Sequence, residues 1–395
     1  MARVLILGGG FGGIVAANAL RALLPAEHHV TVIERQSAFA PGANNLWIML
    51  GDAQRQLRPR PVAALEARGV AVVADEIRAI DPAAVRVETA AHGALSADFL
   101  VIALGAELDM TLIPGLAAAA ETYYTAEGAA RCRDRLGAFE GGDLVTLVSR
   151  MPYKCPPAPY EAAMMLGDLL ERRGIRARAK LAIYTPEPQP LGTGGPVMGD
   201  ALKKMLAMRG IKLATGMTAA EIDPAGREIR FEDGSRAHFD LLLAVPPHVA
   251  PGVVREACLA KPWIPVDRFT CEVPGLDGRV YAIGDVTSIA LPGRHNPDVP
   301  LNLPKAGTFA ESEARVVAKH IASKILGGAS DAAFDGYGEC YVEVQHGLAL
   351  KGQGYFFDEP PRMVPTEPSA QSYQLKREQL LALLDENLAP AEAPH

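Results

Sequence analysis

Two cysteines, Cys155 and Cys340, are the side chains of this sequence whose surroundings best suit redox chemistry. Cys155 lies in the run MPYKCPPAPYE, residues 151–161, which holds four prolines and no glycine. A dinucleotide-binding unit would carry glycines at this point, because its backbone N–H groups must approach a pyrophosphate. Proline has no N–H group. The run is therefore poorly built for a nicotinamide cofactor, and it presents a thiol at the start of a predicted helix.

The neighbours of Cys155 bear on the reactivity of its thiol. Lys154 precedes it, and a helix is predicted from about Tyr160 to Arg173. A nearby cation and a helix N-terminus both lower a thiol pKa, so we expect Cys155 to be reactive. Glu161, at the start of the same helix, is either an acid/base group or a charge that complements the helix dipole.

A glycine-rich turn stands near the N-terminus between a predicted strand and a predicted helix. Residues 4–7 form a short apolar run typical of a buried parallel strand, and residues 14–24 form an alanine-rich helix. The turn fits the GxGxxG fingerprint, and Glu34 ends the next strand, where an adenosine ribose is held. The residues predicted to bind the dinucleotide here are Gly8, Gly10, Phe11, Gly12, Gly13, Glu34 and Arg35.

A later segment indicates that this dinucleotide is FAD. Residues 280–285 form an apolar strand that ends in Gly284-Asp285, and the Asp285 carboxylate could accept a hydrogen bond from a ribityl hydroxyl. Residues 304–307 direct a helix N-terminus at the flavin pyrimidine, and this dipole favours the negative charge of the reduced flavin. Lys305 either stabilises reduced flavin or is a solvated lysine. The further residues predicted to bind FAD are Gly105, which follows an earlier strand, and Gly284, Asp285, Lys305, Ala306 and Gly307.

The order of the elements predicts an α/β protein with two Rossmann-like dinucleotide-binding domains and a small C-terminal tail domain. Residues 1–108 and 268–330 form a discontinuous FAD-binding domain. Residues 109–267 form a second Rossmann-like domain, in which the proline-cysteine turn replaces the nicotinamide site. Residues 331–395 form the tail, with Cys340, a hairpin and a terminal helix.

Composition sets limits on the class of protein. A chain of 395 residues is too long for one hydrophobic core. Its net charge of −7 does not indicate nucleic-acid binding, and no apolar stretch is long enough to span a membrane. The first predicted strand begins at about Arg3, so we expect no signal peptide and a cytoplasmic or peripheral membrane location. Five cysteines are too few for a disulfide scaffold, and no metal site is predicted.

Several motifs together resemble the two-dinucleotide-binding-domain flavoproteins. They are GGGFGG, Glu34, LGA at residues 104–106, KCPPAPYE, YAIGD and LPKAG, and the resemblance covers residues 1 to 360. Within this group the chain resembles sulfide:quinone oxidoreductases and flavocytochrome c sulfide dehydrogenase flavoproteins. KCPPAPYE is similar to the flavocytochrome pattern around the first redox cysteine, and GECY, with Cys340, falls where the family places its second.

The resemblance implies a redox disulfide between Cys155 and Cys340 over the flavin. Sulfide would attack it to leave one persulfide and one thiolate, and the thiolate would pass an electron pair to the flavin. Which sulfur is attacked stays open, and we favour Cys340 with Cys155 facing the flavin. The family has a glutamate in the relation that Glu161 bears to Cys155. The resemblance also implies a sulfur substrate and a quinone or cytochrome c as electron acceptor.

The chain departs from the family pattern at two points, which bear on the sulfur product and on the attachment of FAD. Many sulfide:quinone oxidoreductases carry a third cysteine where this chain has Tyr124, and Cys132 is eight residues later. A two-cysteine site puts long polysulfide products in doubt. Relatives that attach FAD covalently use a cysteine near residue 40 or 125, which this chain lacks, so we predict non-covalent FAD.

Other interpretations stay open. A type II NADH:quinone oxidoreductase shares the architecture, a flavoprotein subunit of a periplasmic complex fits KCPPAPYE, and a non-enzymatic flavoprotein is a third alternative. Tyr355-Phe356-Phe357 is either part of a quinone site or strand core. The terminal amphipathic segment, 373–388, favours core packing or dimer contact over peripheral membrane contact, and a homo-oligomer stays open.

Overall fold

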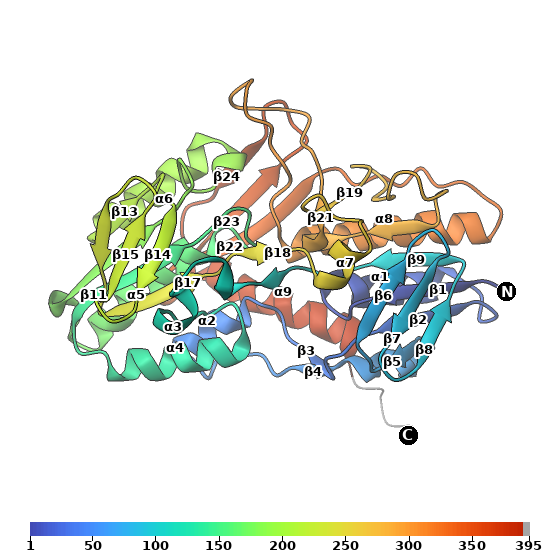
Figure 1. Ribbon diagram of the computed structural model, residues 1–395, viewed down its shortest axis with the longest axis horizontal. Helices are drawn as coiled ribbons and strands as arrows, with labels where there is room; N and C mark the ends of the chain where they lie inside the picture. Colours follow the sequence, from blue (N-terminus) through green and yellow to red (C-terminus); the bar gives the residue numbers. More distant parts are fainter. Residues whose placement is uncertain (390–395) are drawn as a thin grey trace.

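In the computed structural model, which describes residues 1–389, two parallel sheets lie at opposite ends of the molecule (Figure 1). The C-terminal strands and helix α9 lie between them (Figure 1). The mixed α/β architecture with Rossmann-type sheets confirms the predicted fold class.

The first sheet has five parallel strands in the order β20-β9-β1-β2-β5. Strand β20 comes from late in the chain and pairs with β9, as the sequence predicted for a strand returning to this sheet. Helices α1 and α8 pack against each other on the sheet. The elements are β1 (Arg3–Leu7), α1 (Phe11–Leu23), β2 (His29–Ile33), β5 (Ala71–Val73), β9 (Phe99–Ile102), β20 (Val280–Ala282) and α8 (Gly307–Ile325).

The continuous apolar run of β1 is explained by burial on both faces of the sheet. Val4 and Ile6 pack in a core shared with α1 and α8. Leu5 and Leu7 pack on the opposite face, against the antiparallel strands β6 (Ile77–Asp81) and β7 (Arg86–Thr89). A parallel strand covered on both sides has no polar face, so alternation is absent from its sequence.

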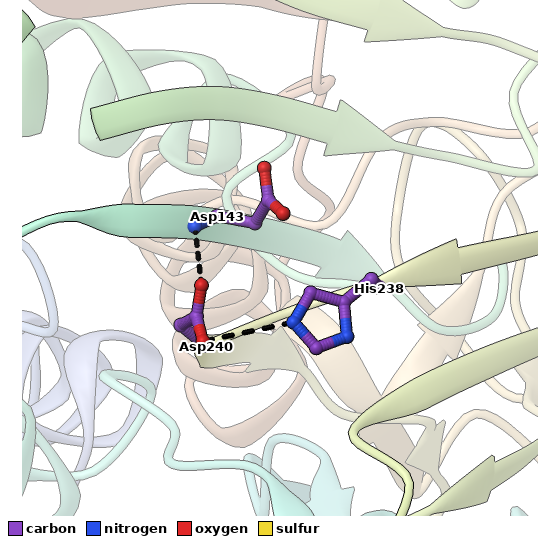
Figure 2. Close-up of side chains that lie close together, drawn as sticks. All are labelled: Asp143, His238 and Asp240. Atoms are coloured by element: carbon purple, nitrogen blue, oxygen red, sulfur yellow. Dashed lines mark hydrogen bonds and ion pairs between the residues drawn. The ribbon is translucent and has the colours of Figure 1, made fainter. Parts of the chain in front are cut away.

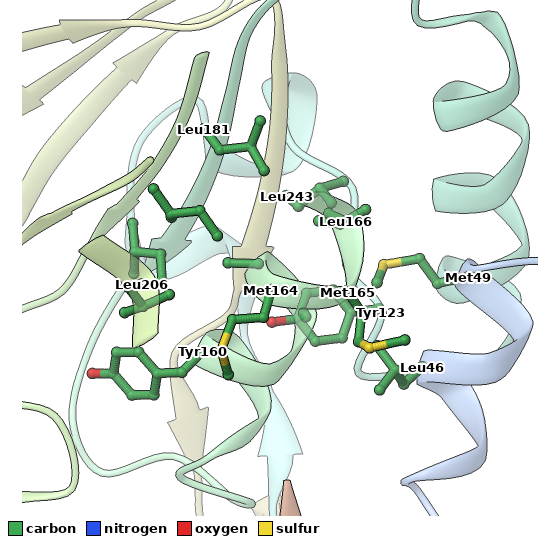
Figure 3. Close-up of a cluster of buried hydrophobic side chains, with 14 of the residues drawn as sticks. Leu46, Met49, Tyr123, Tyr160, Met164, Met165, Leu166, Leu181, Leu206 and Leu243 are labelled. Carbon is green, nitrogen blue, oxygen red and sulfur yellow. The ribbon is translucent and has the colours of Figure 1, made fainter. Parts of the chain in front are cut away.

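The second sheet is parallel, in the order β13-β12-β11-β17. Its main elements are β11 (Gly142–Val148), α5 (Ala158–Arg172), β12 (Ala179–Tyr184), α6 (Pro196–Met208), β13 (Ile211–Ala214) and β17 (Leu241–Val245). Its core surrounds helix α5, whose Met165 lies towards Leu46 and Met49, with Leu206 on the other side (Figure 3). Met49 belongs to α2 (Asn44–Met49), so this core joins the second domain to the first.

The tail is a three-stranded antiparallel sheet followed by a long helix, in agreement with the hairpin and terminal helix predicted from the sequence. The elements are β22 (Tyr337–Gln345), β23 (Leu348–Tyr355), β24 (Arg362–Pro365) and α9 (Ala370–Leu388). Helix α9 packs on β22, β23 and α1 and buries Leu384 and Leu388, so core packing explains its apolar face.

The remaining elements are short or lie outside the two parallel sheets. They are β3 (Ala38–Phe39), β4 (Arg60–Pro61), β8 (Gly93–Ser96), β10 (Glu107–Leu108), α3 (Leu116–Ala119), α4 (Ala126–Ala138), β14 (Ala219–Asp223), β15 (Glu228–Phe231), β16 (Arg236–His238), β18 (His248–Val249), α7 (Gly252–Glu256), β19 (Ile264–Pro265) and β21 (Thr287–Ser288), with 3-10 turns at 62–68, 110–112, 176–178, 192–194 and 284–286.

Candidate active site

A cavity of about 1950 Å³ opens at the carboxyl ends of the first sheet's strands, and the second domain and the tail complete its wall. Open α/β sheets bind their ligands at this edge. Most of the residues predicted to hold a dinucleotide line this cavity. They are Gly8, Gly10, Phe11, Gly12, Glu34, Arg35, Gly105, Gly284, Asp285, Ala306 and Gly307.

The glycine turn after β1 is shaped by close backbone contacts. Gly8 has a φ of +101°, and a Cβ there would lie 2.5 Å from the carbonyl oxygen of Ala103. A Cβ on Gly13 would lie 1.8 Å from the Gly8 oxygen. Gly13 is buried and does not line the cavity, so its prediction as a cofactor contact is corrected: it packs helix α1 against the strand.

Two alanine variants separate these roles. Gly10 has an ordinary φ of −85° and a Cβ there would meet nothing within 4 Å, so Gly10→Ala should fold normally. The new methyl would meet the pyrophosphate, and flavin affinity should fall roughly tenfold or more. Gly13→Ala should instead lower the free energy of unfolding of flavin-free protein by about 1–3 kcal/mol. Urea unfolding and FAD titration measure the two effects. Equal destabilisation by both variants would contradict this division.

Glu34 is held at the end of β2 by backbone N–H groups. Gly9 N donates to Glu34 Oε2 at 2.6 Å, and Gln36 N donates to Oε1 at 2.7 Å. These bonds fix a carboxylate on the cavity wall at the place where Rossmann domains hold an adenosine ribose.

Asp285 supplies a buried acceptor on the wall of the same cavity. Its Oδ1 is buried and has no hydrogen-bond partner in the described part of the chain. Burial raises the pKa of the Asp285 carboxyl, against the opposing charges of Lys154 and Lys305. An orphaned acceptor of this kind suits a hydroxyl donor, such as the ribityl chain of a flavin. The glycine turn, Glu34 and Asp285 therefore fit FAD.

Lys305 is placed differently from one of its two predicted roles. It is buried, and its Nζ donates to the carbonyl oxygens of Asp285 at 2.6 Å and Thr287 at 3.0 Å. The ammonium also stands 3.5 Å from the ring centre of Trp263, and the side chain does not line the cavity. Burial lowers the pKa of Lys305 to about 8. Lys305 is thus not a solvated lysine, because its ammonium is buried and bonds the backbone carbonyls of Asp285 and Thr287.

Cys155 stands on the cavity wall in a backbone conformation that is unusual for a non-glycine residue. Its φ is +54°, in the left-handed region. Its N–H donates to Lys305 O at 2.8 Å, and its carbonyl accepts from Ala158 N at 2.9 Å. The turn is therefore tied both to the first domain and to the start of helix α5.

The expected low pKa of Cys155 is wrong. The residue is exposed towards the cavity, yet the surrounding protein desolvates the thiol and raises its pKa to about 11. The charge of Glu161 adds to this rise, and Lys376 opposes it. The helix N-terminus and Lys154 would lower the pKa of Cys155, but burial raises it by more, because the protein around the sulfur displaces the water that would solvate a thiolate.

Cys340 lies on strand β22, opposite Gly352 of β23, and lines the same cavity as Cys155. A Cβ on Gly352 would lie 3.2 Å from the Cys340 Sγ, so the glycine leaves room for the sulfur. Burial raises the pKa of Cys340 to about 12, and a charge on Cys155 raises it further. Both thiols are free in this structure.

The raised pKa gives a pH dependence opposite to that of an activated thiol. In reduced, flavin-free protein, Cys155 should react with iodoacetamide slowly at pH 8, because only about one thiol in a thousand is ionised three units below the pKa. The rate should rise about tenfold per pH unit towards pH 11. Peptide mapping by mass spectrometry follows Cys155 separately from the exposed Cys258. A rate that is already maximal at pH 8 would contradict the assignment.

Glu161 is part of a buried network of charges that joins four segments of the chain. It accepts from the N–H of Glu343 at 2.7 Å and pairs with the Lys376 ammonium. Lys376 also lies 3.2 Å from Glu343 Oε1, and Arg55 pairs with that same oxygen at 3.1 Å. Glu161 and Lys376 both line the cavity near the two cysteines.

The network explains the protonation of its members. Burial raises the pKa of Glu161, and Lys376 opposes that rise. Burial also disfavours the charged form of Lys376, but Glu161 and Glu343 together raise its pKa. Sequence reasoning missed Lys376, which lies in the terminal helix. A lysine among the apolar positions of that helix was the only available signal.

In the second domain, the position at which a Rossmann domain holds a nucleotide ribose is occupied by bonded side chains of the protein itself. Glu187 follows β12, the second strand of that sheet, where a Rossmann domain holds a nucleotide ribose. Its Oε2 accepts from the hydroxyls of Tyr153 at 2.9 Å and of Tyr160, and all three residues are buried. A carboxylate occupied in this way is not free to bind a dinucleotide.

One group of potential metal ligands lies away from the cavity. Asp143, His238 and Asp240 bring their ligand atoms within 4.8 Å of one another (Figure 2). Asp240 already accepts from Asp143 N at 2.8 Å and pairs with Arg227 at 3.2 Å. These bonds account for the cluster within the protein, and none of the three residues lines the cavity.

The aromatic run of the tail belongs to a core. Phe356 packs with Phe309, and Phe357 packs with Phe334 and Phe269. Phe356 and Phe357 therefore belong to a strand core, and none of the three residues of the run lines the cavity. Within residues 1–389, the helices include none whose length and apolar character would allow it to cross a membrane.

Two family models match successive parts of the chain. The model described as pyridine nucleotide-disulphide oxidoreductase matches residues 2–137. The model described as sulfide dehydrogenase [flavocytochrome c] flavoprotein chain, central, matches residues 130–246. The second match includes the proline-cysteine turn and helix α5.

Several proteins similar to this chain are named as sulfide:quinone oxidoreductases. The mitochondrial sulfide:quinone oxidoreductase of Mus musculus is 26% identical over 305 residues, which cover 72% of this chain and 66% of the mouse protein. The sulfide-quinone reductase of Aquifex aeolicus is 27% identical over 340 residues, covering 82% and 76%. The crystal structure of the Aquifex aeolicus sulfide:quinone oxidoreductase superimposes with a TM-score of 0.86 at 24% identity and covers 99% of this chain and 93% of that one.

Proposed function

Because the chain belongs to the family of sulfide:quinone oxidoreductases and flavocytochrome c sulfide dehydrogenase flavoproteins, we propose that it oxidises sulfide and passes the electrons to a quinone. The observation that carries the proposal is that Cys155 and Cys340 line the same cavity as the residues that fit FAD. Bound there, FAD would supply a two-electron acceptor for the cysteine sulfurs and a donor to the quinone.

The first chemical step is an exchange at a Cys155–Cys340 disulfide. Hydrosulfide attacks the Cys340 sulfur, a new sulfur–sulfur bond forms there, and the old bond breaks. Cys340 then carries a persulfide, and Cys155 leaves as a thiolate with the electron pair of the broken bond. Atoms and charge balance, because one anion enters and one thiolate is formed.

Glu161 and Lys376 manage charge and protons in this exchange. Lys376 holds a buried positive charge that opposes the high pKa of Cys155, so it stabilises the leaving thiolate. Glu161 has a raised pKa and accepts the proton of the new persulfide. A second hydrosulfide ion then attacks the outer sulfur, and the bond between that sulfur and Cys340 breaks. A disulfane anion is released, Cys340 keeps the electron pair of the broken bond, and the proton held by Glu161 returns Cys340 to a thiol.

A type II NADH:quinone oxidoreductase is disfavoured by the second domain. The turn after β11 carries prolines where a nucleotide-binding turn needs N–H groups, and Glu187 is already bonded by Tyr153 and Tyr160. A dinucleotide placed there would have to break buried hydrogen bonds without finding replacements.

We further propose that FAD is bound without a covalent link. The part of the wall that relatives use for attachment offers Tyr124 in this chain, and Cys132 is buried outside the cavity. Acid precipitation should therefore release all of the flavin into the supernatant, as absorbance of that fraction would show. Flavin left on the precipitated protein would contradict this assignment.

Quinone reduction by sulfide is the direct test of the proposed reaction. Purified holoenzyme with a short-chain ubiquinone should reduce the quinone when sulfide is added and should not when NADH is added. Horse-heart cytochrome c in place of quinone distinguishes the sulfide dehydrogenase alternative. Quinone reduction by NADH but not by sulfide would overturn the proposal.

A further inference from the structure

The side chain of Tyr153 reaches back over the turn that carries Cys155. Its hydroxyl lies 3.1 Å from the carbonyl oxygen of Pro156 and 2.9 Å from Glu187 Oε2. Cys155 stands between Tyr153 and Pro156 in the chain, so this contact closes the turn around the cysteine. Tyr153 and Glu187 are both buried.

Glu187 is itself held from several directions. Its Oε2 accepts from Thr185 Oγ1 at 3.0 Å and from the Tyr160 hydroxyl, and its Oε1 accepts from Leu191 N at 3.3 Å. Its carbonyl accepts from Gly216 N at 2.9 Å. A carboxylate fixed by so many donors is a rigid anchor for the phenol of Tyr153, because moving it would leave buried polar groups unpaired.

Cys155 needs such an anchor because its backbone conformation is costly. A non-glycine residue in the left-handed region costs on the order of 1 kcal/mol or more and persists only where the surroundings determine it. A disulfide also requires specific separations of the two Cα and Cβ atoms. A small relaxation of this turn would therefore change how readily Cys155 joins Cys340.

We propose that Tyr153, anchored by Glu187, is a positioning residue that holds the Cys155 turn in the geometry at which the Cys155–Cys340 disulfide forms and opens. The inference rests on the proposed function of the two cysteines. It assigns to the acidic position of the second Rossmann domain a role in supporting the redox cysteine in place of a nucleotide.

Tyr153→Phe and Tyr160→Phe form a matched pair for the test. Each removes one hydroxyl from Glu187, but only the Tyr153 hydroxyl also lies within hydrogen-bond distance of the Pro156 carbonyl, so that its one proton is shared between Glu187 and the turn. The holoenzyme is equilibrated anaerobically in mixtures of reduced and oxidised dithiothreitol, and the Cys155–Cys340 disulfide is quantified by alkylation and mass spectrometry. Thermal unfolding is measured in parallel.

Tyr153→Phe should change the ratio of disulfide to dithiol about fivefold or more, as expected for one lost hydrogen bond, and Tyr160→Phe less than about twofold. Both should lower the unfolding temperature. Equal ratios in the two variants would overturn the positioning role and leave a merely structural one. If Tyr153→Phe does not fold, Glu187→Gln, which keeps an acceptor for Tyr153 but weakens it, must shift the ratio more than about twofold. Wild-type protein that forms no disulfide in any mixture would overturn the proposed function as well.

Discussion

Replacing Cys155 or Cys340 with serine should lower the rate at which sulfide reduces the bound flavin by roughly a thousandfold or more. A serine oxygen cannot form the disulfide that hydrosulfide attacks, so the exchange loses its electrophile. The remaining cysteine alone can offer only a thiol whose pKa lies at about 11 for Cys155 or about 12 for Cys340. Anaerobic stopped-flow absorbance of each variant measures this rate.

Cys258→Ser is the matched control for these variants. Cys258 is exposed and does not line the cavity, so its replacement should leave the rate within about twofold of wild type. All three variants should retain flavin, because the predicted cofactor contacts are untouched. Normal sulfide reduction in either active-site variant would show that electrons reach the flavin without this cysteine pair.

Replacing Lys376 with methionine should lower the free energy of unfolding by about 3–5 kcal/mol. Lys376 and Glu161 have side chains that are each only 6% exposed, and the Glu343 side chain is 1% exposed. Removing the ammonium leaves two buried carboxylates beside each other with Arg55 as the remaining cation, and of these two carboxylates Arg55 pairs with that of Glu343. Urea unfolding of the wild-type and variant holoenzymes measures the loss.

Two further variants test the electrostatic origin of that loss. Lys376→Met combined with Glu161→Gln should recover part of the stability, because the uncompensated carboxylate is gone. Arg172→Met breaks the exposed pair with Asp168 on helix α5 and should cost at most about 1 kcal/mol. A double variant as unstable as Lys376→Met would show that lost packing, and not charge, causes the effect.

The parts of the site that lie close together in the chain could be predicted from the sequence. The turn between β1 and α1, the Glu34 that follows β2 and the Gly284-Asp285 pair after β20 each depend on local strand ends and a few residues. Parallel strands bring their carboxyl ends to one edge, so local predictions were sufficient to place these residues on one cavity.

The charge network could not be predicted because it depends on distant segments. Lys376 and Glu161 are 215 residues apart, and Arg55 meets Glu343 from the first domain. The low pKa expected for Cys155 failed for the same reason. Lys154 and the helix N-terminus are visible in the sequence, whereas the burial that raises the pKa of Cys155 comes from tertiary packing. Lys305 turned inward to Asp285 and Thr287 because the strand end there leaves carbonyls to satisfy.

The most direct measurement is an anaerobic visible spectrum of the purified holoenzyme, titrated with sulfide and, in a separate sample, with NADH. The proposed function predicts that sulfide bleaches the flavin absorbance at once and that NADH leaves it unchanged. Loss of the sulfide response in Cys155→Ser and Cys340→Ser would assign the electrons to the cysteine pair. Bleaching by NADH alone would contradict the account and identify a nicotinamide-linked dehydrogenase.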